Sequence, residues 1–219
     1  MNQQQIISNT IAFVKSTLKG AEGVHDWFHI ERVLKNAILI AETENVDLFI
    51  VQLGALLHDI ADAKFHNGDE TIGPKLAREF LSAQHLNEEI ILHIEQIISH
   101  ISFKNSLDNI RAKFHSPELD VIQDADRLDA IGAIGIARCF NYGGFKNRLL
   151  YDPEVAPKLK MSKEEYKQST APTINHFYEK LLLLKDTMNT KTGQRIAEQR
   201  HVFMETFLSQ FYDEWNGKK

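Results

Sequence analysis

Residues 53 to 65 read LGALLHDIADAKF and join an apolar run to a group of charged and polar side chains. The apolar run begins near residue 48 and ends in the pair His58-Asp59, so we expect the backbone that carries this pair to be buried. A buried carboxylate costs free energy unless it is paired, strongly hydrogen-bonded or bound to a metal. The stretch therefore predicts a helix that delivers a histidine and a carboxylate into the interior, where a positive charge compensates them.

Apolar residues recur at helical spacing along most of the chain, and no period-two strand with hairpin turn residues is found. The expected helices cover about residues 6 to 18, 26 to 40, 48 to 57, 74 to 83, 87 to 99, 117 to 138, 173 to 188 and 192 to 215. Asp26, Asp47 and Asn87 are expected to cap three of them, because a side-chain oxygen there can accept a hydrogen bond from the first free N–H groups. The pattern predicts an all-α fold of roughly eight helices.

The longest irregular stretch, residues 141 to 160, contains Gly143-Gly144 and two prolines. It could link two domains, but neither side has a complete core of its own, so we expect a long loop within one domain spanning residues 1 to 219. The core is expected over about residues 20 to 140, with C-terminal helices over about residues 172 to 215 packed on it. Aromatic residues of those helices are expected to be core, with a dimer surface as the alternative. They are Phe177, Tyr178, Phe203, Phe207 and Phe211.

Composition and charge limit the class of protein. The 219 residues are 43% hydrophobic and 25% charged, as in folded globular proteins, and the net charge is −5. This charge argues against a broad nucleic-acid surface, although it allows a local cationic pocket. The single cysteine, Cys139, fits a reducing compartment. The start shows no signal-peptide features and no apolar run is long enough to span a bilayer, so we expect a cytoplasmic protein with no membrane partner.

A second His-Asp pair, His25-Asp26, is expected to have a different role. It follows a glycine-containing turn and opens a helix, so Asp26 is interpreted as the N-cap of that helix. His29 then lies in the first turn of the same helix. The second pair therefore starts a helix, whereas His58-Asp59 ends one.

Four residues form the candidate metal site: His29, His58, Asp59 and Asp126. Adjacent ligands such as His58 and Asp59 leave an ion with open positions, so other helices must complete the site. Two imidazole nitrogens and two carboxylate oxygens suit a divalent first-row metal. Such an ion lowers the pKa of bound water and polarises the bond that is attacked, which indicates hydrolysis. The alternative is that these histidines are ordinary hydrogen-bonded groups, since the chain contains 10 histidines and some pairing with aspartate is expected by chance.

The ordered pattern H…HD…D formed by these four residues resembles the HD superfamily of metal-dependent phosphohydrolases. Longer motifs are similar to one branch of small single-domain members, and they extend from about residue 20 to about residue 210. These motifs are HDWFHIERV, LLHDIADAKF, ISHISFK, DADRLDAIGAIGIARCF and HFYEKLLLLKDTMNT. The resemblance implies an HD-domain helical bundle with a metal at its centre and with the same four residues as ligands. One ion is expected rather than two, because the additional histidine pattern of the two-metal HD phosphodiesterases is not laid out clearly in this sequence.

For function, the resemblance implies hydrolysis of nucleotides, with conversion of (deoxy)nucleoside triphosphates to monophosphate and pyrophosphate as the expected activity. The alternatives are a nucleoside monophosphate phosphatase of the 5'-nucleotidase type and a non-catalytic nucleotide-sensing module with a structural metal. Mn²⁺ is the expected ion, because it suits phosphate oxygens and mixed nitrogen and oxygen ligands, with Mg²⁺, Fe²⁺, Co²⁺, Ni²⁺ and Zn²⁺ as alternatives. The expected partner is a small nucleotide substrate rather than a nucleic acid, and a homodimer is left open.

Polar residues near the ligands are the candidate catalytic and substrate-binding groups. Asp62 lies three residues after Asp59 on the same helix face. It either acts on the attacking water as a general base or holds a neighbouring side chain in place. The candidate substrate-binding residues are His25, Lys64, His100, Lys104 and Arg127. Their charge would stabilise a polyphosphate in the transition state, and for each of them a solvated surface role is the alternative.

Overall fold

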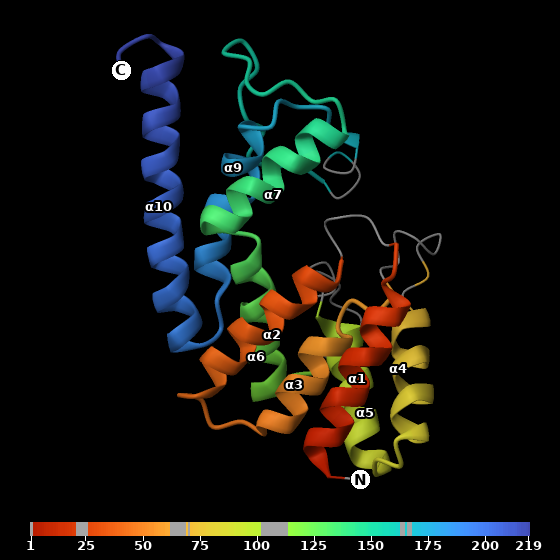
Figure 1. Ribbon diagram of the computed structural model, residues 1–219. Coiled ribbons are helices and arrows are strands. Elements are labelled where there is room, and N and C mark those ends of the chain that lie inside the picture. Colours follow the sequence, from red (N-terminus) through yellow and green to blue (C-terminus); the bar gives the residue numbers. More distant parts are fainter. Residues whose placement is uncertain are drawn as a thin grey trace. The chain divides into compact units, whose positions relative to one another are not determined.

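The computed structural model describes residues 2–20, 26–61, 69, 71–101, 114–162, 165 and 168–219. These residues form α-helices and one 3-10 helix, and none of them lies in a strand, which confirms the all-α prediction. The chain divides into two compact units, Met1–Asp126 and Arg127–Lys219 (Figure 1). The single domain expected over residues 1 to 219 stays a prediction. Within the described part, no helix combines the length and the apolar character needed to cross a membrane.

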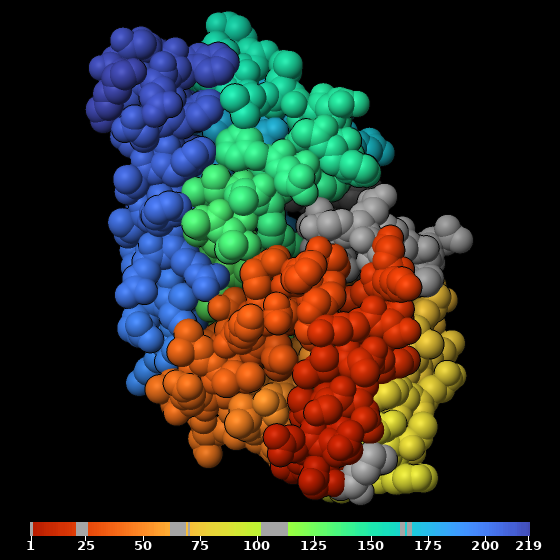
Figure 2. All heavy atoms as spheres, in the orientation of Figure 1, coloured from red at the N-terminus to blue at the C-terminus, as the bar shows by residue number. Residues whose placement is uncertain are grey.

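The first unit is built around a central apolar helix. It contains α1 (Gln3–Thr17), α2 (Trp27–Ala41), α3 (Leu48–Leu57), α4 (Ile72–Ala83), α5 (Glu88–His100) and most of α6 (Pro117–Asp129). Helix α3 contacts α1, α2 and α5. All of its residues except Leu48 and Gln52 are buried, as expected for a helix that is apolar on every side. Figure 2 shows α1 to α3 in red and orange over one face of this unit, with α4 in yellow along its edge.

Side-chain caps fix where three of these helices begin. The side chains of Asp26, Asp47 and Asn87 accept hydrogen bonds from first-turn N–H groups at 2.9, 2.8 and 2.9 Å. All three predicted caps are thereby confirmed. Each such bond satisfies a donor that the helix itself leaves unpaired. The cap at Asp26 has a consequence for the site, because it holds His29 in the first turn of α2.

The prediction of one helix over residues 117 to 138 is wrong. Helix α6 ends at Asp129, and α7 (Gly132–Phe145) begins after a sharp turn. Gly132 has a φ of +74°, which glycine adopts without the strain that a side chain would cause. A Cβ atom at Gly132 would also lie 2.9 Å from the side chain of Arg200. The chain therefore changes direction at a glycine, which the apolar periodicity alone did not indicate.

The second unit packs its core around aromatic rings. It contains α7, α9 (Asn175–Glu179), the 3-10 helix η3 (Leu181–Thr187) and α10 (Lys191–Trp215), and α10 contacts both α7 and η3. Phe177 is fully buried, and its ring centroid lies 5.9 Å from that of Phe207 and 6.0 Å from that of Phe140. The core role predicted for Phe177 is therefore confirmed. Phe203 differs, because its side chain is 51% exposed.

A half-buried histidine of this unit, His176, should make stability depend on pH. Burial, together with the positive charges of Lys180 and Arg148, lowers the pKa of His176 from about 6.5 to about 4. The folded state therefore takes up fewer protons than the unfolded state between these values. The stability that depends on neutral His176 is therefore fully present above about pH 6.5. As the pH falls towards 4, the free energy of unfolding should decrease by on the order of 3 kcal/mol. Urea unfolding of the wild type and of His176→Gln between pH 7.5 and pH 4 measures this loss. Equal pH dependence in both proteins would refute it.

Candidate metal centre

Three side chains from three segments of the first unit lie close together. His29 lies in the first turn of α2, His58 follows α3 directly, and Asp126 lies in α6. Oδ1 of Asp126 is 3.5 Å from Nε2 of His29 and 3.9 Å from Nε2 of His58. The potential ligand atoms of these three residues all lie within 4.8 Å of one another. Both imidazoles are buried, whereas the Asp126 side chain is 39% exposed.

Hydrogen bonding fixes which ring nitrogen of His58 can act as a ligand. Its Nδ1 lies 2.9 Å from the carbonyl oxygen of Ala55. A carbonyl can only accept, so Nδ1 carries the proton, and neutral His58 keeps a lone pair on Nε2. That lone pair faces the carboxylate of Asp126 at 3.9 Å, and a cation between the two atoms makes the contact favourable. The donor set therefore fits a divalent metal ion, as at metal sites where a carbonyl orients the liganding histidine.

Asp59, the fourth predicted ligand, does not belong to this group of three. It follows His58 directly, is half-buried and has an interaction of its own. Both residues lie in the turn that follows α3. Its role as a ligand stays a prediction.

The other predicted site residues are only partly covered by the structure. Four of them, His25, Asp62, Lys64 and Lys104, lie outside the described residues. Nδ1 of His100, at the end of α5, lies 2.8 Å from the carbonyl oxygen of Gln96. The guanidinium of Arg127 donates to the carbonyl oxygen of Thr187. Neither bond involves the three ligands, so substrate contacts of His100 and Arg127 stay predictions.

Two groups at the site were not identified from the sequence. One is the carbonyl of Ala55, which no side-chain pattern can reveal. The other is the amide of Asn36, whose Nδ2 donates to the carbonyl oxygen of Ala125 at 3.3 Å. Asn36 lies seven residues after His29 on α2, and Ala125 directly precedes Asp126. A polar residue two turns from His29 on the same helix face was the available signal.

Asp129, three residues after Asp126 on α6, has a different environment. It is 1% exposed, and its Oδ2 lies 2.5 Å from Nη1 of Arg138. The same Nη1 donates to the backbone carbonyl oxygen of Asp129 at 3.1 Å. Arg200 donates to the carbonyl oxygen of Leu128. These arginines satisfy carbonyl groups at the end of α6, where positive charge is favourable. Asp129 is therefore a structural residue.

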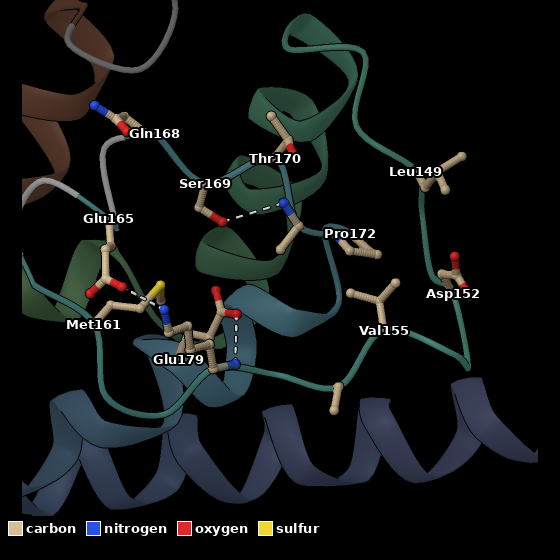
Figure 3. Close-up of a pocket in the computed structure, with 13 residues that line it drawn as sticks. Leu149, Asp152, Val155, Met161, Glu165, Gln168, Ser169, Thr170, Pro172 and Glu179 are labelled. Carbon is tan, nitrogen blue, oxygen red and sulfur yellow. Dashed lines mark hydrogen bonds and ion pairs between the residues drawn. The ribbon is translucent and has the colours of Figure 1, made fainter.

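A cavity in the second unit contains none of the predicted site residues (Figure 3). Its volume is about 610 Å³, and its acidic side chains Asp152, Glu165 and Glu179 all accept hydrogen bonds from the chain. Glu165 pairs with Nζ of Lys158 at 2.6 Å and accepts the N–H of Ser162 at 2.7 Å. These bonds lower the pKa of Glu165 to about 2, with the Lys158 bond as the largest cause. Glu179 accepts the backbone N–H of Lys158 at 3.1 Å. The carboxylates therefore brace the surrounding loop.

Comparison with known proteins identifies the family. Residues 27–131 match the HD domain family. The crystal structure of an HD-superfamily hydrolase from Bacillus thuringiensis is 44% identical in sequence to this chain, with a TM-score of 0.78. The match covers 98% of this chain and 99% of the other. The chain belongs to the HD superfamily of hydrolases.

Two further matches of this HD protein involve YpgQ from Bacillus subtilis. The YpgQ sequence is 37% identical over 204 residues, which cover 90% of this chain and 88% of YpgQ. A crystal structure of YpgQ in complex with ADP matches 98% of this chain and 97% of its own, with 36% identity and a TM-score of 0.75. HD domains bind divalent metals, and the ligand atoms of His29, His58 and Asp126 lie close enough together to hold such an ion.

Proposed function

We propose that this HD protein hydrolyses (deoxy)nucleoside triphosphates to the monophosphate and pyrophosphate. The proposed ion is Mn²⁺, held by His29, His58 and Asp126 together with Asp59. The observation that carries the proposal is the meeting of two imidazole Nε2 atoms and a carboxylate oxygen in a chain of the HD superfamily. The complex of YpgQ with ADP supports a nucleotide as the ligand class. The proposal includes a cytoplasmic location and leaves a homodimer open.

When bound, the metal supplies Lewis-acid polarisation of the phosphate and a lowered pKa of the attacking water. The chain contributes fixed ligand directions. The bond from His58 to the Ala55 carbonyl holds that imidazole ring, and the Asp26 cap holds the backbone of His29. Asp126 supplies negative charge where the two Nε2 atoms meet.

Other residues take the remaining roles in the proposal. Asp62 accepts the proton of the attacking water, and the predicted cationic residues bind the phosphates. Those residues are His25, Lys64, His100, Lys104 and Arg127. Arg127 is the least suited of them, because its guanidinium already donates to the carbonyl of Thr187.

Product analysis tests the proposal. We would strip the full-length protein of metal, add Mn²⁺ and offer a panel of nucleoside mono- and triphosphates in ¹⁸O-labelled water. Phosphorus NMR should show monophosphate and pyrophosphate in equal amounts from triphosphates. Attack of water on the α-phosphorus places the label in the monophosphate, whereas attack on the β-phosphorus places it in pyrophosphate. Asp126→Asn serves as the control, because it removes the charge of a ligand and keeps the shape of the side chain.

The alternatives give different products. Orthophosphate released only from monophosphates would replace the proposal with a 5'-nucleotidase. Nucleotide binding without turnover under Mn²⁺, Mg²⁺, Fe²⁺, Co²⁺, Ni²⁺ or Zn²⁺ would favour a sensing module with a structural metal. Either result would leave the family assignment intact and overturn the proposed reaction.

A further inference from the structure

Gly54 of α3 faces Ile122 of α6 with no space for a side chain. A Cβ atom at Gly54 would lie within 3.0 Å of Cδ1 of Ile122 and at 3.4 Å from Cγ2 of Ile97. Ile122 and Ile97 are both 0% exposed, and Gly54 is buried as well. A displaced Cδ1 would have to find room in a filled core, where added atoms are poorly accommodated. The close approach of α3 to Ile122 therefore depends on the missing side chain of Gly54.

This contact lies one helical turn before two of the three ligands. His58 follows Gly54 by four residues, and Asp126 follows Ile122 by four residues. Residues four apart share a helix face, so the pair Gly54 and Ile122 and the pair His58 and Asp126 are successive contacts between α3 and α6. Metal sites require ligand distances within about 0.2 Å of their preferred values. A shift of α3 at Gly54 should therefore be felt at Nε2 of His58.

A hydrogen bond fixes the distance between α2 and α6 in a similar way. Nδ2 of Asn36 donates to the carbonyl oxygen of Ala125 at 3.3 Å. Asn36 shares a face of α2 with His29, and Ala125 directly precedes Asp126. Helix α6 is thus fixed against α2 beside the ligand that it carries.

We propose that Gly54 and Asn36 are positioning residues for the metal site. They set the spacing of α3 and α2 from α6, so that His58, His29 and Asp126 can bind one ion. This inference rests on the proposed function in that these three residues are the ligands. Ordinary core packing is the rival explanation, and it predicts changes in stability without changes in metal affinity.

The test compares Mn²⁺ dissociation constants of full-length variants by isothermal titration calorimetry, with the EPR spectrum of bound Mn²⁺ as a second readout. Gly54→Ala should raise the constant at least about tenfold, the size seen when groups that orient ligands are lost. Adding Ile122→Val removes the Cδ1 atom that the new Cβ would meet, so the double variant should recover most of the affinity. Asn36→Leu, which keeps the side-chain size and removes the donor, should also weaken binding.

Gly73→Ala is the matched control, because Gly73 is also a buried helical glycine of the first unit. A Cβ there would lie 3.5 Å from Cγ2 of Ile98, which is an ordinary contact. The Mn²⁺ dissociation constant and the EPR spectrum of Gly73→Ala should match those of the wild type.

Wild-type Mn²⁺ binding separates the positioning roles of Gly54 and Asn36 from the proposed function. If the wild type binds Mn²⁺ and both Gly54→Ala and Asn36→Leu bind it equally well, the positioning roles are wrong and the proposed function stands. Weaker binding by Gly54→Ala that Ile122→Val does not restore would also overturn the role of Gly54. If Gly54→Ala does not fold, Asn36→Leu, altered at a half-buried residue, decides the inference. A wild type that binds no divalent ion would overturn both proposals.

Discussion

Asp126→Asn should raise the Mn²⁺ dissociation constant by more than about a hundredfold and reduce nucleotide hydrolysis to a similar extent. Loss of a group that only orients a ligand already costs about 10- to 100-fold, and Asp126 provides the negative charge of the three-residue group. Without that charge, the three-residue group offers nitrogen donors only, and Asp59 is the one proposed ligand that keeps a negative charge. Isothermal titration calorimetry and phosphorus NMR measure the two losses.

Stability provides the control for Asp126→Asn. The carboxylate lies 3.5 and 3.9 Å from the imidazole nitrogens, so in metal-free protein the free energy of unfolding should change by less than about 1 kcal/mol. A metal that binds only the folded state should stabilise the wild type by about 2.7 kcal/mol at one hundred times its dissociation constant. Urea unfolding should show this gain in the wild type and not in the variant. An equal gain in both would remove Asp126 from the site.

Asp129→Ala should show the opposite combination, a large loss of stability with metal binding retained. Asp129 is 1% exposed and balances the charge of Arg138, whose side chain is 20% exposed. Removing one partner of a buried ion pair typically costs about 3–5 kcal/mol. The Mn²⁺ dissociation constant should stay within about a factor of two, because the charge of Asp129 is balanced by Arg138 and Asp129 does not belong to the three-residue group. Urea unfolding and calorimetry again provide the measurements.

The double variant Asp129→Ala with Arg138→Ala separates the ion pair from simple loss of packing. Removing both charges should recover part of the stability lost in the single variant, since the Arg138 guanidinium no longer lacks its carboxylate partner. If Asp129→Ala instead weakened Mn²⁺ binding as much as Asp126→Asn, the division between a ligand and a structural carboxylate on α6 would be wrong.

Local patterns were sufficient to predict most of the helices and of their starting points. The helix expected over residues 173 to 188 is divided into α9 and the 3-10 helix η3. Capping by Asp26, Asp47 and Asn87 depends on neighbouring backbone groups only, so it can be read from sequence. The break before Gly132 was missed, because a glycine can adopt either sign of φ and the apolar spacing continues through this position. Helix periodicity thus located the elements and failed where a single backbone torsion decided the path.

Some of the candidate ligands could be predicted from the sequence, because an ionisable pair at the end of an apolar helix is unusual in a buried position. His29, His58 and Asp126 meet, but the geometry between them depends on how helices approach one another. The space at Gly54 is defined by Ile122, which lies far away in the sequence. No local pattern contains that relation. The position of the Arg127 guanidinium is likewise set by the carbonyl of a distant residue, Thr187.

The carbonyl of Ala55 has an implication for mutational scanning and for sequence drift. Every amino acid has a main-chain carbonyl, so replacing residue 55 with another small residue leaves the acceptor of His58 Nδ1 in place. The tautomer of this imidazole is therefore encoded by helix register and not by the identity of residue 55. Alanine scanning would pass over this group, and only a change of the backbone itself, such as an amide-to-ester replacement, would expose its contribution.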